Sequence, residues 1–240
     1  MSSNFVVRHG TDLHENEVVR YTLQERMCHW IVGLSYLYLF ATGMALFTPY
    51  LYWMAYVLGG GPTIRFWHPW VGLIFFAGIL WMHKMWHSEM KVTEQDRQWS
   101  KAVKEYVTNH DDQLPPAGHF NHGQKQFYWA MFWGAILLLI TGLLMWFPEV
   151  VSGHRATNTG HSLMPLVVFL HCVGALVTIG AFFIHIYMGV FFVSGGLHGI
   201  LFGRVPVSWA KAHHRLWYEE IQRGDRSRIA PTTFRRGADD

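Results

Sequence analysis

Long stretches of apolar residues, with only Lys84 charged among them, alternate with polar segments along the chain. Four such stretches are present, near Trp30–Phe47, Trp67–Trp86, Phe127–Phe147 and Leu163–Val193. The first three are close to the roughly 20 apolar residues that an α-helix needs to cross a bilayer, and the fourth is long enough to continue past it. Residues that end helices lie between them, as in the Gly59–Pro62 run and the Pro115-Pro116 pair. The pattern predicts an all-α integral membrane protein built as a four-helix bundle.

The composition agrees with a membrane protein. Hydrophobic residues make up 51% of the chain and charged residues 15%, whereas a soluble domain carries roughly 25% charged residues. This composition excludes a disordered chain and a disulfide-rich scaffold. The two cysteines, Cys28 and Cys172, are expected in opposite halves of the membrane and therefore unable to bridge each other. No signal peptide is expected in residues 1–26, and no internal repeat stands out.

Lysine and arginine are distributed unevenly among the polar segments. The N-terminal segment holds three, the second loop six and the C-terminal tail eight, whereas the first and third loops hold one each. Positive residues concentrate on the cytoplasmic side of membrane proteins. We therefore expect a cytoplasmic N-terminal segment (1–26), a transmembrane domain (27–203) and a basic cytoplasmic tail (204–240). This topology also explains the net charge of +3, so no nucleic-acid partner is expected.

Among the 16 histidines, the main candidates for a function inside the membrane are His29, His68, His171 and His185, which lie in or beside the predicted spans. Ionisable side chains are costly inside a bilayer and usually serve a function there. His171 and His185 share one helix, and their 14-residue spacing places them ~21 Å apart on nearly the same face. They are too far apart to share one metal ion, but each can bind a different haem.

The predicted topology pairs these histidines by depth. The second and fourth spans bring His68 and His171 to the outer half of the membrane, and the first and fourth bring His29 and His185 to the inner half. The chain has no Cys-x-x-Cys-His motif for covalent haem attachment. The sequence therefore predicts two haems b, each held by two histidines.

A glycine follows each of these histidines by three or four residues: Gly33, Gly72, Gly174 and Gly189. Residues at these spacings lie on the histidine's own helix face, so the missing side chains would let a flat macrocycle approach the backbone. Small residues are also common where membrane helices pack against each other.

Two further motifs have ordinary explanations. His83 and His87 form an i, i+4 pair at the inner end of the second span, where anchoring at the membrane interface is favoured over metal ligation. Asn121 directly precedes the third span, where its side-chain oxygen is suited to capping the helix.

The chain resembles the cytochrome b (gamma) subunit of membrane-bound respiratory formate dehydrogenase. The matching pieces are Arg26–Trp30, His68-Pro69, Asn121–Lys125, Leu170-His171, His185–Met188, Trp209–His214 and Trp217-Tyr218. The haem-ligand pieces are shared with cytochrome b subunits of NiFe hydrogenases and of thiosulfate or polysulfide reductases, which remain the alternative. Asn121–Lys125 and the tail point more narrowly to formate dehydrogenase.

The resemblance implies one subunit of a three-part enzyme in the bacterial cytoplasmic (inner) membrane. A molybdenum or tungsten alpha subunit would oxidise formate, and an iron–sulfur beta subunit would pass the electrons on. This chain would carry them from the outer to the inner haem and reduce a membrane quinone, either menaquinone or ubiquinone. The resemblance places Asn121, Gly123 and Gln124 at the quinone, assigns no residue to formate oxidation itself, and allows a higher oligomer.

Two functions from other classes fit less well. A metal-ion transporter would need carboxylates or clustered ligands along its path, and the spans contain essentially no Asp or Glu. A purely structural membrane anchor leaves four costly, regularly placed histidines unexplained.

Overall fold

The computed structural model describes residues 17–104, 115–152 and 163–224. Predictions that concern residues 1–16, Arg155 and the tail beyond residue 224 fall outside these ranges. The chain divides into two compact units. Among the described residues, unit 1 comprises 17–26, 89–104, 115–125 and 186–224, and unit 2 comprises 27–88, 126–152 and 163–185. The division at residues 26 and 203 stays a prediction.

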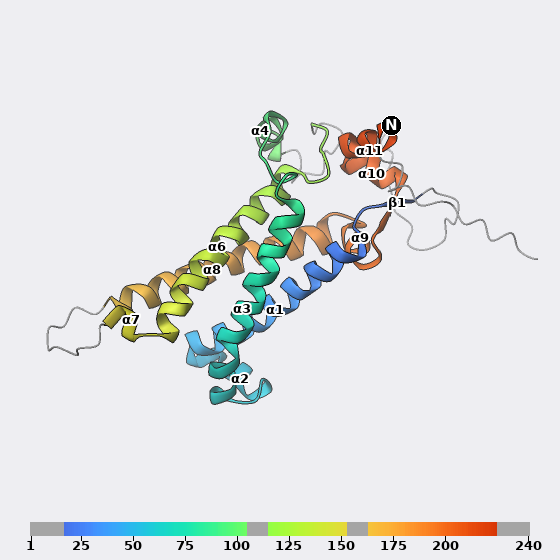
Figure 1. The fold of residues 1–240 in the computed structure, drawn as a ribbon. Helices are drawn as coiled ribbons and strands as arrows, with labels where there is room; N and C mark the ends of the chain where they lie inside the picture. The colour runs from blue at the N-terminus through green and yellow to red at the C-terminus, as the bar shows by residue number, and fades with distance from the viewer. Residues whose placement is uncertain (1–16, 105–114, 153–162, 225–240) are drawn as a thin grey trace, which may run out of the picture. The chain divides into compact units, whose positions relative to one another are not determined.

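Four long helices dominate the fold (Figure 1). They are α1 (Leu23–Phe47), α3 (Gly61–Trp86), α6 (His122–Trp146) and α8 (Met164–Ile186), the last continuing as the π-helix η3 (Tyr187–Phe192). Each is long and apolar enough to cross a membrane. The predicted four-span, mainly helical architecture is therefore confirmed, whereas the side on which each terminus lies stays a prediction.

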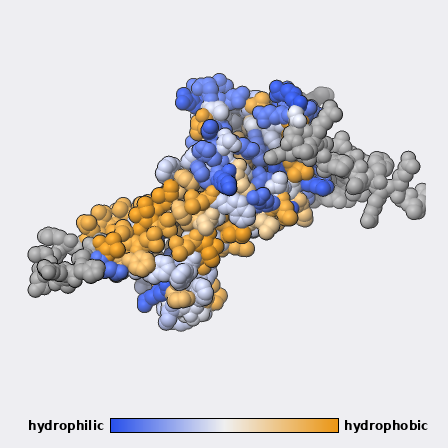
Figure 2. Space-filling model, viewed as in Figure 1, coloured by the Kyte–Doolittle hydropathy of each residue, from blue (hydrophilic) through white to orange (hydrophobic). Residues whose placement is uncertain are grey.

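The long helices expose large apolar side chains. Leu34, Trp133, Val177 and Ile184 are 61%, 60%, 62% and 66% exposed, and Figure 2 shows hydrophobic side chains gathered over these helices. Water-soluble proteins rarely expose contiguous apolar surfaces of this kind. Because an α-helix satisfies its own backbone hydrogen bonds, such helices are stable in lipid.

Reciprocal hydrogen bonds fix the starts of two helices. The Thr22 hydroxyl accepts from the Glu25 backbone N–H at 3.3 Å, and the Glu25 carboxylate accepts from the Thr22 N–H at 2.7 Å. Thr93 and Asp96 form the same capping box ahead of α4 (Glu94–Lys101). These boxes satisfy backbone donors that a helix start leaves unpaired, so they determine where the polar segments end and the helices begin.

In its described residues, unit 2 has three short helices besides its parts of the spans: η1 (Pro49–Leu51), α2 (Trp53–Val57) and α7 (Glu149–Ser152). Ala45, Ala55 and Ile64 form a small buried cluster in which α2 packs beside α1 and α3. Cys28 and Cys172 are both free, as the sequence predicts.

Unit 1 is built from short elements. Besides α4 they are β1 (Glu17–Val19), α9 (Gly196–Phe202), β2 (Arg204–Pro206), α10 (Val207–His213) and α11 (Arg215–Arg223). β1 pairs antiparallel with β2, with Val18 opposite Val205. Both valines join Ala210, Trp217 and Ile221 in a buried apolar cluster. This short sheet ties the residues before the first span to those after the last.

Arg20 is buried beside that cluster, with only 1% of its surface exposed. Its guanidinium donates to the His119 carbonyl and lies 3.2 Å from Nε2 of His214. The guanidinium carbon also lies 4.7 Å from the centre of the Trp217 ring, within cation–π range. Arg20 thus links segments that are far apart in the sequence.

Candidate haem and quinone sites

The structure brings His29 and His185 together, as the sequence predicts. His29 lies on α1 and His185 near the end of α8, with ring centroids 6.2 Å apart. Two imidazoles that bind one metal ion from opposite sides have centroids roughly 6 Å apart, because each metal–nitrogen bond is about 2 Å. Nδ1 of His29 is buried and has no hydrogen-bond partner among the described residues. The pair therefore fits the two axial ligands of one haem.

Aromatic side chains surround this pair. The Phe127 ring on α6 stacks on His185 with centroids 4.3 Å apart and planes 6° from parallel. Trp30 meets His29 edge-on at 5.5 Å. The π-helix η3 begins at Tyr187, two residues after His185, and π-helical turns frequently occur at functional sites.

His68 lies near the start of α3 and is oriented by Thr42 on α1. The Thr42 hydroxyl lies 2.7 Å from Nδ1 of His68 and 2.8 Å from the Tyr38 carbonyl. A hydroxyl has one proton, and a carbonyl can only accept. The hydroxyl therefore donates to Tyr38 and accepts from Nδ1–H of His68. This tautomer leaves Nε2 of His68 with the lone pair that a haem iron needs.

His171 on α8 has the same arrangement with Thr141 on α6. The Thr141 hydroxyl lies 2.8 Å from Nδ1 of His171 and 2.7 Å from the Leu137 carbonyl. Nδ1 of His171 therefore donates, and its Nε2 keeps the lone pair that a haem iron needs. His68 and His171 are close enough to interact electrostatically. The structure thus brings together both pairs that the depth argument predicts.

Three of the four glycines next to the histidines border open space. A Cβ added at Gly33, Gly72 or Gly189 would meet no heavy atom within 4 Å, as expected where a macrocycle lies against the helix. A Cβ at Gly174 would instead lie 3.0 Å from Leu137. Gly174 therefore serves ordinary helix packing.

No group of three or more His, Cys, Asp or Glu side chains in the described part of the chain is arranged to hold a metal ion. The four candidate histidines lie instead in two pairs. Paired imidazoles match the two axial positions that haem iron offers, so the donor set fits haem better than a metal ion held by side chains alone.

Asn121 and Gln124 cap α6. The Asn121 side-chain oxygen accepts from the Gln124 N–H at 2.9 Å, and the Gln124 side-chain oxygen accepts from the Asn121 N–H at 3.0 Å. The capping expected from the sequence is therefore present. The cap uses only the oxygen of each side-chain amide and leaves both NH2 groups available as donors. Gly123 lies between them, and a Cβ there would be 3.6 Å from the Asn121 oxygen.

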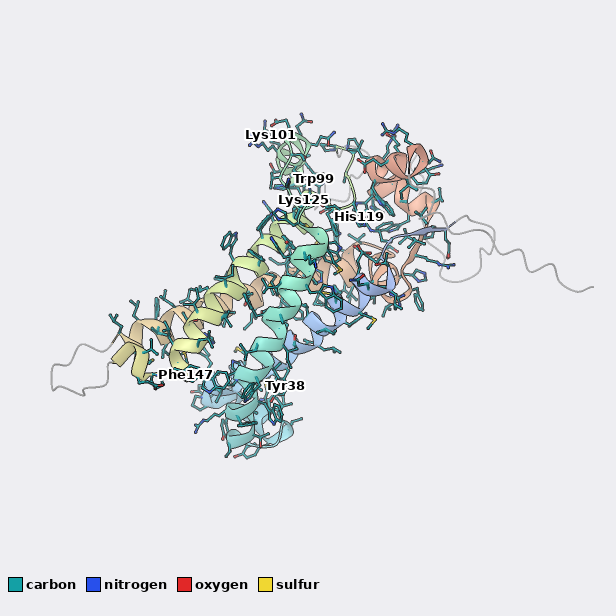
Figure 3. All side chains as sticks on the ribbon, viewed as in Figure 1. Tyr38, Trp99, Lys101, His119, Lys125 and Phe147 are labelled. Carbon is teal, nitrogen blue, oxygen red and sulfur yellow. The ribbon has the colours of Figure 1, made fainter. Side chains whose placement is uncertain are left out.

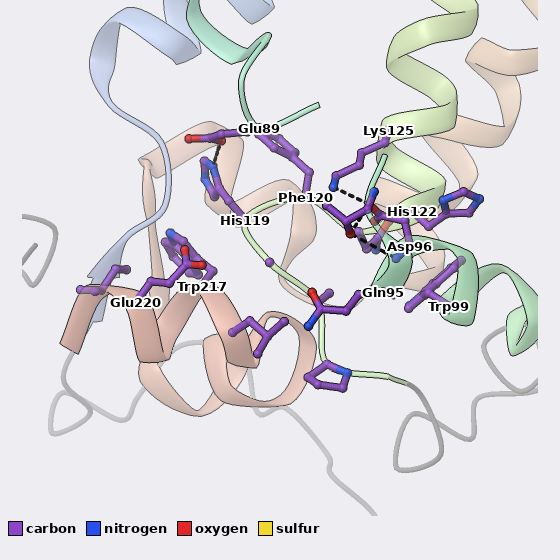
Figure 4. Close-up of a pocket in the computed structure, with 17 residues that line it drawn as sticks. Glu89, Gln95, Asp96, Trp99, His119, Phe120, His122, Lys125, Trp217 and Glu220 are labelled. Atoms are coloured by element: carbon purple, nitrogen blue, oxygen red, sulfur yellow. Dashed lines mark hydrogen bonds and ion pairs between the residues drawn. The ribbon is translucent and has the colours of Figure 1, made fainter. Parts of the chain in front are cut away.

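A cavity of about 410 Å³ in unit 1 adjoins this cap. Figure 4 shows its polar lining, in which Lys125 pairs with Asp96 and His119 with Glu89. The Lys125–Asp96 distance is 2.7 Å, and both side chains are more than 90% buried. Burial alone would raise the pKa of Asp96, but hydrogen bonds from Lys125 and Thr93 bring that pKa below its ordinary value. The Asp96 carboxylate is therefore ionised at neutral pH. Figure 3 shows Lys125 and Trp99 near each other.

His83 belongs to an aromatic cluster. Its Nδ1 lies 2.6 Å from the Tyr128 hydroxyl, and its ring stacks on Phe132 at 4.4 Å. His87 lies 4.7 Å from it, centre to centre. Anchoring at the membrane interface stays a prediction for this pair.

Sequence reasoning missed Thr42 and Thr141. A signal was present, because the first and third spans each contain one Thr-Gly pair, Thr42-Gly43 and Thr141-Gly142. Each glycine lies against the ring that its threonine orients, with a hypothetical Cβ 3.6 Å and 3.4 Å from Cε1 of the histidine.

Comparison with known proteins gives a consistent result. A family model described as prokaryotic cytochrome b561 matches residues 20–203. The formate dehydrogenase cytochrome b556(fdo) subunit of Escherichia coli (strain K12) is 30% identical over 207 residues, covering 86% of this chain and 94% of the relative. The nitrate-inducible formate dehydrogenase cytochrome b556(Fdn) subunit of the same organism is 28% identical, covering 87% and 93%. The formate dehydrogenase cytochrome b556 subunit of Haemophilus influenzae is 28% identical, covering 86% and 84%. Four apolar helices, two histidine pairs and these matches together show that the chain belongs to the prokaryotic cytochrome b561 family of membrane electron-transfer subunits.

Proposed function

We propose that this chain is the dihaem membrane subunit of a formate dehydrogenase complex and passes electrons to a membrane quinone. The observation that carries the proposal is the arrangement of four histidines as two pairs on apolar helices, in a chain similar to a formate dehydrogenase cytochrome over 94% of that relative's length.

The four histidines would hold two haems b. His29 and His185 are assigned to the inner haem, and His68 and His171 to the outer haem. When bound, the haems supply one-electron transfer at potentials set by their axial ligands and surroundings. The protein contributes the orientation of each imidazole and an apolar environment that excludes water.

The quinone is assigned to the start of α6. The NH2 groups of Asn121 and Gln124 are suited to donating hydrogen bonds to a quinone carbonyl, with Gly123 between them giving close access to the backbone. The cavity beside Asn121 also contains His119 and His122, which are suited to moving the protons that quinone reduction consumes. The same helix carries Phe127, which stacks on His185.

The partners follow from the same proposal. A catalytic alpha subunit with molybdenum or tungsten would oxidise formate, and an iron–sulfur beta subunit would deliver electrons to the outer haem. The excess of Lys and Arg in the N-terminal segment, second loop and tail supports cytoplasmic termini in a bacterial inner membrane. Protons taken from the cytoplasm would then make the transfer electrogenic.

Affinity purification of the full chain from native membranes tests this function. Co-purifying subunits are identified by mass spectrometry, and formate is added anaerobically while the haem absorption is recorded. We expect a molybdenum or tungsten subunit and reduction of the haem by formate. Reduction by hydrogen but not by formate, together with a hydrogenase subunit, would instead support the hydrogenase alternative.

A further inference from the structure

We propose that Thr42 and Thr141 are matched positioning residues that fix the tautomer of the outer ligands, His68 and His171, and lower the reduction potential of the haem they hold. The inference rests on the proposed ligation of the outer haem by these two histidines.

The hydrogen bonds determine which nitrogen faces the iron. Each threonine hydroxyl donates to a carbonyl of its own helix, at 2.8 Å for Thr42 and 2.7 Å for Thr141. Each therefore accepts from the Nδ1–H of its histidine, at 2.7 Å and 2.8 Å. If the hydroxyl instead donated its proton to Nδ1 of the histidine, its oxygen and the carbonyl oxygen of its own helix would lie in close contact with no proton between them. Nε2 is thus held as the ligating nitrogen, and the hydrogen bond fixes the rotation of the ring.

The two arrangements occupy equivalent positions in the fold. Thr42 lies 19 residues after the first residue of α1, Leu23, and Thr141 lies 19 residues after the first residue of α6, His122. Likewise, His68 and His171 each lie seven residues after the start of their own helices, α3 and α8. The helix pairs α1–α3 and α6–α8 therefore present the outer ligands in the same way.

The inner ligand His29 lacks this support. Its Nδ1 is buried and has no hydrogen-bond partner among the described residues. A hydrogen-bond acceptor at Nδ1–H increases the electron-donating strength of a ligating imidazole. An imidazole that donates electrons more strongly to the iron favours the oxidised state of the iron. The threonines therefore lower the potential of the outer haem relative to the inner haem. Transfer from the outer to the inner haem becomes more favourable as a result.

The test uses the purified complex containing the full chain and measures haem content and haem midpoint potentials by optical redox titration. The outer-haem wave is identified as the one lost in His68→Ala. Thr42→Val and Thr141→Val remove the hydroxyl and keep the shape of the side chain, whereas Thr42→Ser and Thr141→Ser keep the hydroxyl. Thr178→Val is the matched control. Thr178 is also buried, and its hydroxyl bonds the Ala175 carbonyl and the Tyr36 hydroxyl but no histidine.

We expect each valine variant to retain the inner-haem wave and to move the outer-haem wave to a more positive potential. A tenfold change in the reduction equilibrium corresponds to about 59 mV for a one-electron couple, and we expect a shift of about that size. The serine variants and Thr178→Val should titrate like the wild type. Loss of the outer haem in a valine variant but not in the matching serine variant would also support the proposal.

Two results overturn the inference. One is an unchanged outer-haem wave in both valine variants, and the other is an equal shift or loss in the serine variants. Failure of the proposed function is recognised separately. In that case the wild type does not show two separate haem waves, or both waves remain in His68→Ala.

Discussion

The imidazole rings of His29 and His185 lie with their centroids 6.2 Å apart and their planes tilted by 47°, although the two residues are 156 positions apart along the chain. This contact joins the first and last membrane helices. Bringing two strongly polar rings together in an apolar bundle is unfavourable unless they share a ligand. The pair therefore supports the proposed inner haem site, and the threonine-supported pair of His68 and His171 supports the proposed outer one.

Removing one inner ligand should remove one haem. We expect His29→Ala or His185→Ala to reduce the haem content from two to one per chain, because a haem with one remaining axial ligand is held weakly. A pyridine haemochrome assay on the purified complex measures this loss. His198→Ala is a suitable control, since His198 lies in α9 outside both pairs. Retention of both haems in His29→Ala would contradict the pairing.

The role of Asn121 at the quinone can be separated from its role as a cap. Asn121→Asp keeps an oxygen that caps α6 but loses the NH2 donor, whereas Asn121→Ala loses both and costs about 1 kcal/mol of stability. We expect Asn121→Asp to melt like the wild type in detergent while its quinone-dependent turnover falls.

Full quinone turnover in Asn121→Asp, with turnover lost only in Asn121→Ala, would show that capping is the sole contribution of this residue. Haem reduction by formate serves as the internal control, because it does not require quinone and should persist in both variants.

The buried ion pair of Lys125 and Asp96 should be sensitive to the loss of one partner. Lys125→Met leaves the Asp96 carboxylate buried without its counter-ion, which typically costs about 3–5 kcal/mol. We expect a lower unfolding temperature and faster proteolysis of unit 1. The double variant Lys125→Met/Asp96→Asn should recover much of the loss, because it removes the unpaired charge.

The exposed pair of Arg97 and Glu94 provides the comparison. Both side chains are more than 70% exposed, and exposed pairs contribute little to stability. Arg97→Gln should leave the unfolding temperature nearly unchanged. If Lys125→Met also left the unfolding temperature nearly unchanged, the buried pair would have no structural role.

His214 should make unit 1 sensitive to acid. Burial, together with the charge of Arg20, holds the pKa of His214 well below its ordinary value. Its Nδ1 donates to the Gly118 carbonyl at 2.7 Å and its Nε2 faces Arg20, so the folded chain keeps the ring neutral. The unfolded chain binds a proton below a pH of about 6.5. The contribution of neutral His214 to folding stability should therefore be fully present above this pH and should decline as the pH falls below it.

Thermal unfolding recorded between pH 8 and pH 5 measures this effect. His214→Gln should flatten the profile over that range. Protonation of Asp96 is a separate effect. Because its pKa is lowered, its contribution to stability is lost only in a more acidic range. A profile that is equally steep in the variant and the wild type would assign the acid sensitivity to another group.

The spans and the proximity of the paired histidines could be predicted because each depends on few physical factors. Apolar length determines which segments cross the membrane, and the cost of burying an imidazole identifies His29, His68, His171 and His185. The helix starts were less predictable. The third span begins at His122 and not near Phe127, because the Asn121–Gln124 cap starts the helix within a polar segment.

Unit 1 could not be predicted from the sequence pattern. It depends on contacts between distant segments, such as Val18 with Val205 and Arg20 with His119 and His214. Strands of three residues are too short for an alternating pattern to identify. Thr42 and Thr141 were missed for a related reason. A threonine on an apolar helix is unremarkable in sequence until the neighbouring helix places a histidine against it.

The central claim is that this chain holds two haems b, and the haem-to-protein ratio of the purified chain tests it most directly. Haem is measured as the pyridine haemochrome, and protein by amino-acid analysis of the same sample. Two haems b per chain is the expected result, with two waves in a redox titration. A chain with one haem or none, isolated from membranes with ample haem supply, would contradict the account.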